Sequence, residues 1–234
     1  MPDLLYGLGA IQSPSDARDW PLQLAPAEGA LPSRFVATGM GPVLNQGKLP
    51  QCVAYATAGL KTWEEKKDAH GVVTWDTRDF YQRCKAIDDI PGDGTTNRAA
   101  MRVLRNAGMR PIGEPEADPA HYRIAAYYAV PLDLDSLKAA LMQYGPITVG
   151  GEWYNNWFHP IGGILPAPKG RPVGGHAVLV FGWDDSVNGG SLLVRNSWGY
   201  YVGSVNGNFY GAYRHFIPSL WEAWKATDIV SHPR

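Results

Sequence analysis

Cysteine is scarce in this sequence, and the scarcity excludes one class of small proteins. Cys52 and Cys84 are the only two cysteines among 234 residues. One pair cannot supply the disulfide framework that holds small secreted domains together, so we expect the fold to depend on a hydrophobic core. The 45% content of hydrophobic residues is sufficient to fill such a core.

Long apolar runs and runs of one charge are also missing. No apolar stretch approaches the roughly 20 residues that span a bilayer, and the first residues, MPDLLYGLGAIQS, carry no cationic start. We therefore expect no membrane partner and no signal peptide. Lysine and arginine total 21 against 22 acidic residues, without a basic run that would neutralise several phosphates. We therefore expect no nucleic-acid partner.

The usual patterns of metal and phosphate sites are lacking as well. Asp88, Asp89 and Asp93 share one loop, but their spacing does not fit a calcium-binding loop, and a solvated loop is the favoured interpretation. The two cysteines do not have the spacing of zinc ligands, and no glycine-rich phosphate loop is present. We expect no metal and no cofactor.

The patterns that are present predict three parts. Residues 1–32 form an irregular N-terminal extension that we expect to lie along the body. Residues 33–130 form a mainly helical lobe, and residues 131–234 form a mainly β lobe. Because helices precede strands instead of alternating with them, the pattern predicts an α+β fold of two lobes, not a parallel βαβ sheet.

Helical periodicity marks four segments, and strand patterns follow them. The first helix begins at or beside Cys52, and the third ends at Gly108, in a position that favours a left-handed cap. The other predicted helix bounds are about 76–87, 96–107 and 134–144. The predicted strands are PITVGGEW, GGHAVLVFGW, SLLVRNSWG and GNFYGAYRHF.

Cys52 is a candidate nucleophile because of its place at the start of a helix. The partial positive charge and the free N–H groups of a helix N-terminus favour a thiolate over a thiol. A lone cysteine is nevertheless more often a buried core residue, so this assignment needs partner residues.

A predicted hairpin supplies two such partners. GGHAVLVFGW and SLLVRNSWG are joined by a turn-rich loop, which predicts an antiparallel hairpin. In such a hairpin, residues whose numbers sum to about 374 lie opposite each other. His176 is therefore expected opposite Asn196, within about two residues of exact register. An Asn side-chain oxygen can hold an imidazole in one tautomer and orientation, although His176 alone would be read as a core histidine. The remaining histidines lack such a partner and are expected to be structural or exposed: His70, His121, His159, His215 and His232.

Gln46 is a candidate hydrogen-bond donor to the same site. It lies six residues before Cys52, on a loop that contains Gly and Pro. Its side-chain amide and the Cys52 backbone N–H would together form an oxyanion hole, where the loss of one donor typically costs about 100- to 1000-fold in turnover. Taken alone, Gln46 would be read as an exposed loop residue. An aromatic stretch at residues 153–158 could line a cleft or belong to the core.

These motifs, in this order, resemble the papain-like cysteine peptidases. The segments VLNQGKLPQCVAYATA, YGPITVGGEW, WFHPIGGIL, GGHAVLVFGW and LLVRNSWG follow the family's order over roughly residues 33 to 216, and LVRNSWG is the most specific. The resemblance implies a two-lobed papain-like fold, with a helical lobe, an antiparallel β-barrel-like lobe and an active-site cleft between them. The chain looks most like bacterial or phage members without a long prodomain, which implies a cytoplasmic or phage-associated location and folding without a prodomain.

The resemblance also implies a catalytic group. Cys52 would be the nucleophile, His176 the base, Asn196 the residue that orients the base, and Gln46 the oxyanion donor. The implied activity is hydrolysis of peptide bonds in polypeptide substrates through an acyl-thioester intermediate. Proteinaceous thiol-protease inhibitors are candidate partners.

Three further residues are implied to contact the substrate or to protect the catalytic group. Gly94 would pair with the substrate backbone. Gly174 and Gly175, the two residues before His176, also suggest an open floor of the cleft, with Gly175 as the candidate substrate contact. Trp198 would cover the pair formed by His176 and Asn196.

The sequence departs from the family around the nucleophile. Pro50, Gln51 and Val53 stand where the family usually has a Gly, a small residue and a Trp. Proline donates no N–H and stiffens the adjacent loop. Leu49 replaces a cysteine that the family usually pairs in a disulfide, which leaves Cys84 as an expected buried core thiol.

Two other functions stay open. The same catalytic group could hydrolyse isopeptide bonds or the peptide amides of cell walls. Alternatively, the chain could be a non-catalytic papain-like module for binding or structure, although the intact set of Cys52, His176, Asn196 and Gln46 argues against this.

Overall fold

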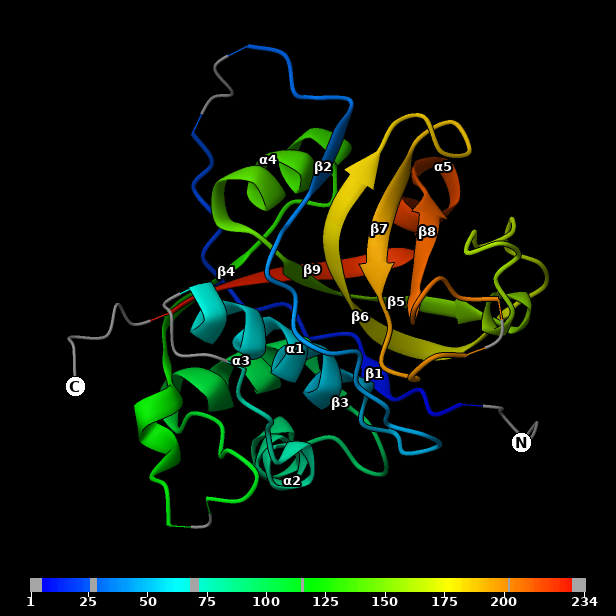
Figure 1. Cartoon of the computed structure of the whole chain (residues 1–234). Coiled ribbons are helices and arrows are strands. Elements are labelled where there is room, and N and C mark those ends of the chain that lie inside the picture. The colour runs from blue at the N-terminus through cyan, green and yellow to red at the C-terminus, as the bar shows by residue number, and fades with distance from the viewer. Residues whose placement is uncertain (1–5, 26–28, 68–71, 115, 202, 229–234) are drawn as a thin grey trace.

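The computed structural model describes residues 6–25, 29–67, 72–114, 116–201 and 203–228. Helices α1, α2 and α3 lie on one side of these residues, and the large sheet lies on the other together with α4 and α5 (Figure 1). The α-helices are α1 (Cys52–Lys67), α2 (Thr77–Asp88), α3 (Asn97–Asn106), α4 (Leu134–Tyr144) and α5 (Tyr213–Phe216). The strands are β1 (Ala10–Ile11), β2 (Arg34–Val36), β3 (Thr95–Thr96), β4 (Ile124–Ala129), β5 (Ile147–Tyr154), β6 (Pro172–Asp184), β7 (Ser191–Arg195), β8 (Asn208–Ala212) and β9 (Leu220–Asp228). Three 3₁₀ turns complete the set: η1 (Pro119–Tyr122), η2 (Asn155–Phe158) and η3 (Ile217–Ser219).

Local sequence signals explain where the helices begin and end. The side chains of Asp76, Thr96 and Asp133 each accept a hydrogen bond from a first-turn N–H of α2, α3 and α4. After α3 the chain turns at Gly108, whose φ of +72° lies in the left-handed region. The first predicted helix begins at Cys52 as expected, and its predicted end before Gly71 falls at residues outside the described ones. The bounds of the other three predicted helices are confirmed within about two residues.

The second half of the chain forms most of a seven-stranded antiparallel sheet. Its order is β4-β9-β5-β6-β7-β8, with β2 paired to β6 as well. In the β6–β7 hairpin, Leu179 lies opposite Arg195, which is the register that the turn-rich loop predicts. The predicted α+β fold with two lobes is confirmed.

The sheet differs from the sequence-based prediction at its last elements. The segment predicted as one strand to residue 216 leaves the sheet at Ala212 and continues as α5. This reversal carries Phe216 back over Gly211, where an added Cβ would lie 2.6 Å from the ring, and buries Phe216 to 2% exposure. Strand β9, which follows α5, was not predicted.

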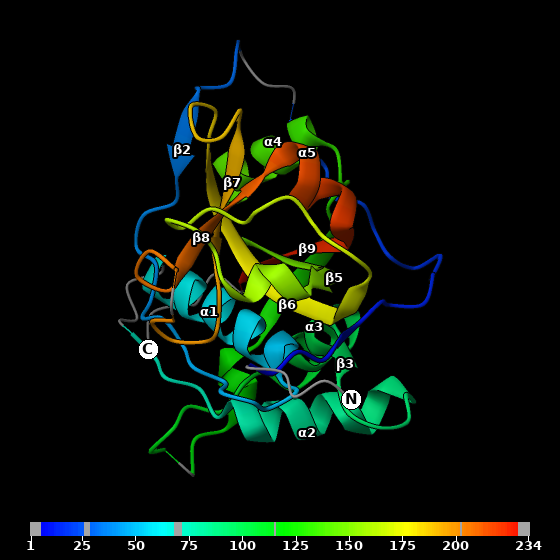
Figure 2. The ribbon, with the colours of Figure 1, turned by 90° about the vertical axis from the view of Figure 1, so that its right-hand side faces the viewer.

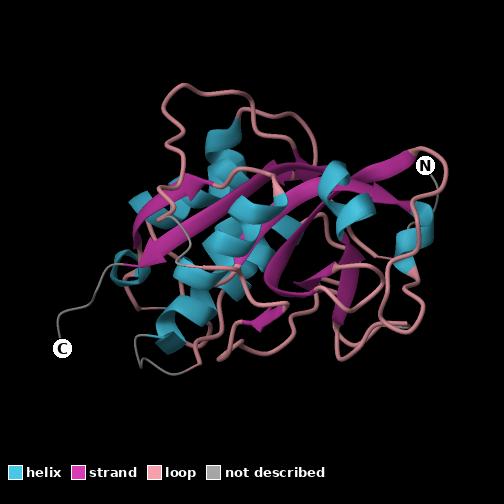
Figure 3. Ribbon diagram, turned by 90° about the horizontal axis from the view of Figure 1, so that it is seen from above, coloured by secondary structure: helices cyan, strands magenta, loops and turns pink. Residues whose placement is uncertain are grey.

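Strand β6 separates the two hydrophobic cores because successive side chains alternate between its faces. Ala177 and Leu179 face the core shared with α1, α2 and α3, whereas Val178 and Val180 face the core of the β lobe. In Figure 2, α1 lies beside β6, and Figure 3 shows helices and strands packed against each other in the view from above. Alternation places His176 on the side of Val178, toward the β lobe.

Helix α1 is held against the sheet by buried charges. Lys225 on β9 contacts Glu64 at 2.5 Å, while Lys61 contacts Glu65 at 2.7 Å and Asp228 at 2.6 Å. These side chains are at most 8% exposed. Periodicity predicts that one apolar face of α1 is buried, but the structure buries charged residues on other faces as well. These ion pairs fix the C-terminal half of α1 relative to the sheet.

The division into residues 1–32, 33–130 and 131–234 stays a prediction. Strands β2 and β4 lie within 33–130 but pair in the large sheet, with β6 and β9 respectively. Their partners are distant in sequence, so no local pattern indicates the pairing. No described helix is long and apolar enough to cross a membrane.

Candidate active site

Cys52 is the first residue of α1 and lies against the sheet. Its side chain is completely buried, and its Sγ accepts a hydrogen bond from the backbone N–H of Ala177, at an N···S distance of 3.3 Å. Burial raises the pKa of the thiol to about 12, although the N–H groups of Ala177, Val53 and Ala10 act in the opposite direction. In this structure Cys52 is a neutral thiol that touches the residue next to His176.

His176 and Asn196 form the contact that the hairpin predicts. His176 Nε2 lies 2.8 Å from Asn196 Oδ1, and both side chains are 2% exposed. The imidazole stacks on Trp198, with ring centroids 4.6 Å apart, and meets the edge of Trp153 at 4.7 Å. Burial lowers the pKa of His176 to about 4, so the imidazole is neutral at pH 7. Its second nitrogen, Nδ1, is buried and has no hydrogen-bond partner among the residues that the structure describes.

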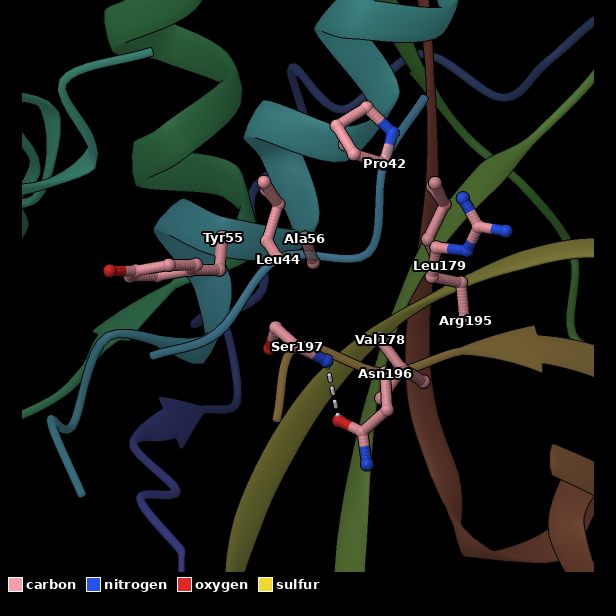
Figure 4. A pocket seen from close by; sticks show the side chains of 10 residues that line it. Pro42, Leu44, Tyr55, Ala56, Val178, Leu179, Arg195, Asn196 and Ser197 are labelled. Carbon is pink, nitrogen blue, oxygen red and sulfur yellow. Dashed lines mark hydrogen bonds between the residues drawn. The ribbon is translucent and has the colours of Figure 1, made fainter. Parts of the chain in front are cut away.

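Asn196 is itself held in place by its neighbours. Its Oδ1 also accepts from the Ser197 N–H at 2.8 Å (Figure 4), and its Nδ2 lies 3.4 Å from the Tyr201 hydroxyl. A cavity of about 20 Å³ lies behind it, between α1 and the strands, and is large enough for about one water molecule. This cavity is too small to be the binding site of a peptide.

Gln46 is buried to 2% exposure and bonded at both ends of its amide. Its Nε2 donates to the carbonyl of Gly7 at 3.1 Å and to that of Leu49 at 2.7 Å, and its Oε1 accepts from the Ser197 hydroxyl at 2.5 Å. The exposed-loop interpretation of Gln46 is therefore wrong. Ser197, which sequence reasoning did not single out, ties the loop of Gln46 to the strand end that carries Asn196.

The N-terminal extension passes directly through this site. Residues 6–11, here called the strap, lie between the start of α1 and strand β6 (Figure 1). On the helical side, Gly7 donates to the carbonyl of Gly47 at 2.9 Å, and the Gly9 carbonyl accepts from Thr95 N–H at 2.9 Å. Strand β1, within the strap, runs parallel to β3.

The strap is bonded to the sheet side as well. Gly9 N–H donates to the carbonyl of Gly175 at 3.0 Å, and Trp198 Nε1 donates to the carbonyl of Gly7 at 3.1 Å. The ring of Tyr6 stacks on Trp198, with centroids 4.8 Å apart and planes at 12°. The strap thus uses backbone groups on both walls, as an extended peptide ligand would.

Glycine is required where the strap meets the loop before Cys52. A Cβ on Gly7 would lie 2.0 Å from the carbonyl oxygen of Leu49, and one on Gly9 would lie 2.4 Å from that of Pro50. Gly9 also has a φ of +119°, which side chains rarely adopt. The alternation Gly7-x-Gly9 was the available sequence signal for this close approach, and sequence reasoning missed it.

Two predicted substrate-contact glycines lie against the strap. A Cβ on Gly94 would be 2.5 Å from the Gly9 carbonyl oxygen, and one on Gly175 would be 2.1 Å from that of Ala10. Gly94 N–H is held by the Tyr81 hydroxyl at 2.9 Å. Both glycines leave room for a peptide backbone in the cleft.

The strap directs a backbone N–H group toward the sulfur of Cys52. The carbonyl that Gln46 holds belongs to Gly7, whereas the group that faces Cys52 Sγ is the backbone N–H of Ala10. The carbonyl oxygen of the same peptide unit, that of Gly9, accepts from the Thr95 N–H, whereas Gln46 Nε2 donates to Gly7 and Leu49. The strap therefore occupies the cleft without the geometry of a substrate.

The other candidate residues lie apart from this site. Cys84 is fully buried, and both cysteines are free. Asp88 pairs with Lys85 at 3.1 Å, and no group of metal-ligating side chains occurs in the described part of the chain. The aromatic stretch at 153–158 belongs largely to the core of the β lobe.

The remaining histidines are also outside the cleft. His121 and His159 are exposed, and His215 is half-buried next to Arg214. His70 and His232 lie outside the described residues.

Comparison with known proteins identifies the family. The family described as "Papain family cysteine protease" matches residues 60–214, which include His176 and Asn196 and begin after Cys52. The chain belongs to the papain family. The resemblance inferred from the sequence motifs is thereby confirmed.

Individual papain-family proteins resemble the chain over different lengths. A cathepsin B-like cysteine proteinase 5 of Caenorhabditis elegans is 30% identical over 156 residues, which cover 62% of this chain and 44% of that protein. A gut-specific cysteine proteinase of the same organism is 31% identical over 98 residues, or 42% of this chain and 29% of that protein. The chain thus matches less than half the length of these two curated relatives.

Solved structures of the papain family match nearly the whole chain. The crystal structure of xylellain, a cysteine protease from Xylella fastidiosa, is similar with a TM-score of 0.84 at 26% identity, covering 96% of this chain and 97% of that one. A procathepsin B from Trypanosoma congolense has a TM-score of 0.80 at 18% identity, covering 96% and 87%.

Proposed function

We propose that this chain is a cysteine peptidase that hydrolyses peptide bonds, with Cys52, His176 and Asn196 as its catalytic triad. The contact of 2.8 Å between His176 and Asn196 carries the proposal, together with the position of Cys52 Sγ beside Ala177. Membership of the papain family supports the same activity. No cofactor is required for this chemistry.

The proposed reaction starts with proton transfer from Cys52 to His176. Asn196 holds Nε2, which leaves the partnerless Nδ1 to exchange a proton with the thiol. The sulfur then attacks the scissile carbonyl carbon, and the resulting oxyanion accepts hydrogen bonds from Gln46 Nε2 and the Cys52 N–H. His176 protonates the leaving amine, and water, deprotonated by His176, then hydrolyses the thioester to release the acid and the thiol.

In the closed arrangement, with the strap in the cleft, the enzyme is latent. The strap fills the space next to Cys52, excludes water from the pair of Cys52 and His176, and occupies the donor of Gln46. Burial accordingly favours the neutral thiol and the neutral imidazole. Catalysis requires the strap to leave the cleft.

Hydrolysis of a fluorogenic peptide library tests the assignment of Cys52. The assay is made in a Gly9→Ala background, because that substitution should displace the strap and remove latency. Cys52→Ala should lower turnover to background, since no other thiol replaces the nucleophile. Cys84→Ala is the matched control and should retain activity. Full turnover by the Cys52→Ala variant would exclude Cys52 as the nucleophile.

The substrate class is tested with the same variants. Unfolded proteins, isopeptide-linked peptides and purified peptidoglycan are offered in parallel to Gly9→Ala. Cleavage of unfolded proteins supports a general peptidase. Cleavage confined to isopeptide-linked peptides or peptidoglycan would instead indicate a hydrolase specific for cross-linked amides. A Gly9→Ala chain that cleaves none of them and whose Cys52 titrates like an ordinary thiol would be a non-catalytic module.

A further inference from the structure

The extension that carries the strap is also anchored on helix α3. Within the docked segment, residues 13–20, Asp19 contacts Arg98 Nη1 at 2.8 Å and Asp16 lies 3.7 Å from the same nitrogen. Arg98 Nη2 donates in addition to the carbonyl of Pro14. The Arg98 side chain is only 10% exposed, so the docked segment covers most of this guanidinium.

A cavity of about 200 Å³ lies between the docked segment and α3, and its lining is mostly charged. The charged side chains are Arg18, Arg98, Arg102, Arg105, Asp16 and Asp19. The carboxylates are already paired: Arg18 contacts Asp16 at 2.6 Å and Arg98 contacts Asp19 at 2.8 Å. Among the described residues, Arg102 and Arg105 take no part in the ion pairs of this cavity, and their spacing puts both on one face of α3. The cavity therefore has an excess of positive charge.

The neutral lining adds hydrogen-bond donors. Burial, and to a lesser degree the nearby Asp19 carboxylate, raise the pKa of Tyr127, while Arg102, Arg105 and Arg98 act in the opposite direction. Tyr127 therefore keeps its hydroxyl proton at neutral pH and can donate it. The side-chain amide of Asn106 lines the same cavity and supplies further N–H donors.

The size and the donors of the cavity define the ligand chemistry. Its volume of about 200 Å³ is below the roughly 300–1,000 Å³ of pockets for drug-sized molecules. A peptide segment does not fit such a space, whereas a compact anion with several oxygens does. Guanidinium groups bind phosphate oxygens in a bidentate manner, so phosphate is the anion that this lining suits best.

We infer that the cavity binds a compact phosphate anion and that the bound anion holds the extension on the body. Arg18 belongs to the docked segment and Arg102 and Arg105 belong to α3, so the complete site exists only while the segment is docked. A ligand that needs both walls must stabilise the docked arrangement over the open one. The docked segment begins two residues after the strap, so the anion should also favour the latent state. This second effect depends on the proposed latency, whereas binding does not.

Calorimetric titration with inorganic pyrophosphate tests the site itself. The buffer contains no phosphate, and sodium chloride holds the ionic strength constant. The wild-type chain should bind pyrophosphate, and the double variant Arg102→Ala/Arg105→Ala should bind it about tenfold or more weakly, because both of these guanidiniums are lost. Arg78→Ala, an exposed arginine on α2, is the matched control. No binding by the wild type, or equal binding by the double variant, would overturn the site.

Labelling of Cys52 by iodoacetamide tests the effect on the extension. Pyrophosphate should slow labelling in the wild type and should not change it in the double variant. Binding without slower labelling would show that the anion does not hold the strap in place. The effect on the extension would then be overturned, and only the anion-binding site would remain. Because calorimetry needs no turnover, Cys52→Ala should bind pyrophosphate like the wild type, whatever becomes of the proposed peptidase activity.

Discussion

The two walls of the cleft are built by different interactions. The helical wall presents mainly backbone groups, such as the carbonyls of Leu49 and Pro50, at the start of a helix that buried ion pairs hold in place. The sheet wall presents side chains, with His176 and Asn196 joined at 2.8 Å by the register of two adjacent strands. The contact between His176 and Asn196 forms within the sheet wall. The contact between Cys52 and Ala177 forms only when the helical wall packs against the sheet wall.

The strap contacts both walls, in addition to the direct bonds between them, such as the one between Ala177 N–H and Cys52 Sγ. It bonds to Gly47 and Thr95 on the helical side and to Gly175 and Trp198 on the sheet side. The walls differ in how they are built, but we expect the position of the strap, more than either wall, to decide whether the cleft is open or closed. Variants that displace the strap, or that weaken one wall alone, can therefore separate the contributions of the strap, the helical wall and the sheet wall to the activity of the site.

The largest expected effect is on the ionisation of Cys52. In the closed chain burial raises the pKa of the thiol to about 12, so almost no thiolate exists at pH 7. Displacing the strap with Gly9→Ala lets water reach the thiol and removes the cause of this upward shift. At pH 7, a fall of the pKa to the unperturbed value of about 8.5 or below raises the thiolate fraction by about a thousandfold or more.

Iodoacetamide labelling across a pH series measures this change. In the wild type, labelling should be slow at pH 7 and should increase toward high pH, because the thiol loses its proton only as the pH approaches its raised pKa. In Gly9→Ala, labelling should already be fast at pH 7. A Cys84→Ala background makes Cys52 the sole thiol. Equal labelling rates in both chains would show that the strap does not control Cys52.

The next effect is on turnover by the intact chain. Gly9→Ala should raise activity on a fluorogenic peptide by about a hundredfold, because a Cβ 2.4 Å from a backbone oxygen can be accommodated only if the strap moves. Gly29→Ala is the matched control, since Gly29 has a similar φ of +95° in the same extension but nothing within 4 Å of an added Cβ. If both variants had the activity of the wild type, the proposed latency would be wrong.

The smallest expected effect belongs to the sheet wall. Asn196→Ala, made in the Gly9→Ala background, removes a buried hydrogen bond worth about 2 kcal/mol, which corresponds to roughly a thirtyfold lower kcat. KM should change little, because the orientation of His176 affects the reaction more than binding. Asn208→Ala breaks a similar bond, to Arg195 at 2.9 Å, away from the imidazole, and should leave kcat unchanged. An equal loss in both variants would indicate damage to the sheet and not to His176.

Much of the fold could be predicted because its signals are local. Helices α2, α3 and α4 have caps at Asp76, Thr96 and Asp133, and periodicity located all four long helices. The β6–β7 hairpin was predictable down to its register, since a turn between two strands fixes which residues face each other. This local rule also brought His176 to Asn196.

Other features depend on contacts between distant residues. The pairing of β2 with β6 and of β4 with β9 could not be predicted, because the partners are far apart in the sequence. The same applies to α5, where the burial of Phe216 ends a segment that has the pattern of a strand. Ser197 was missed because its role appears only when the loop of Gln46 lies beside it.

The sequence by itself determined the papain-family motifs, the helix that starts at Cys52, and the strand register that joins His176 to Asn196. Only the tertiary structure decided that residues 6–11 fill the cleft and leave both Cys52 and His176 buried and neutral. The reason is physical: a helix start or a hairpin is specified by neighbouring residues, whereas the solvation of a thiol depends on whichever distant segment packs over it.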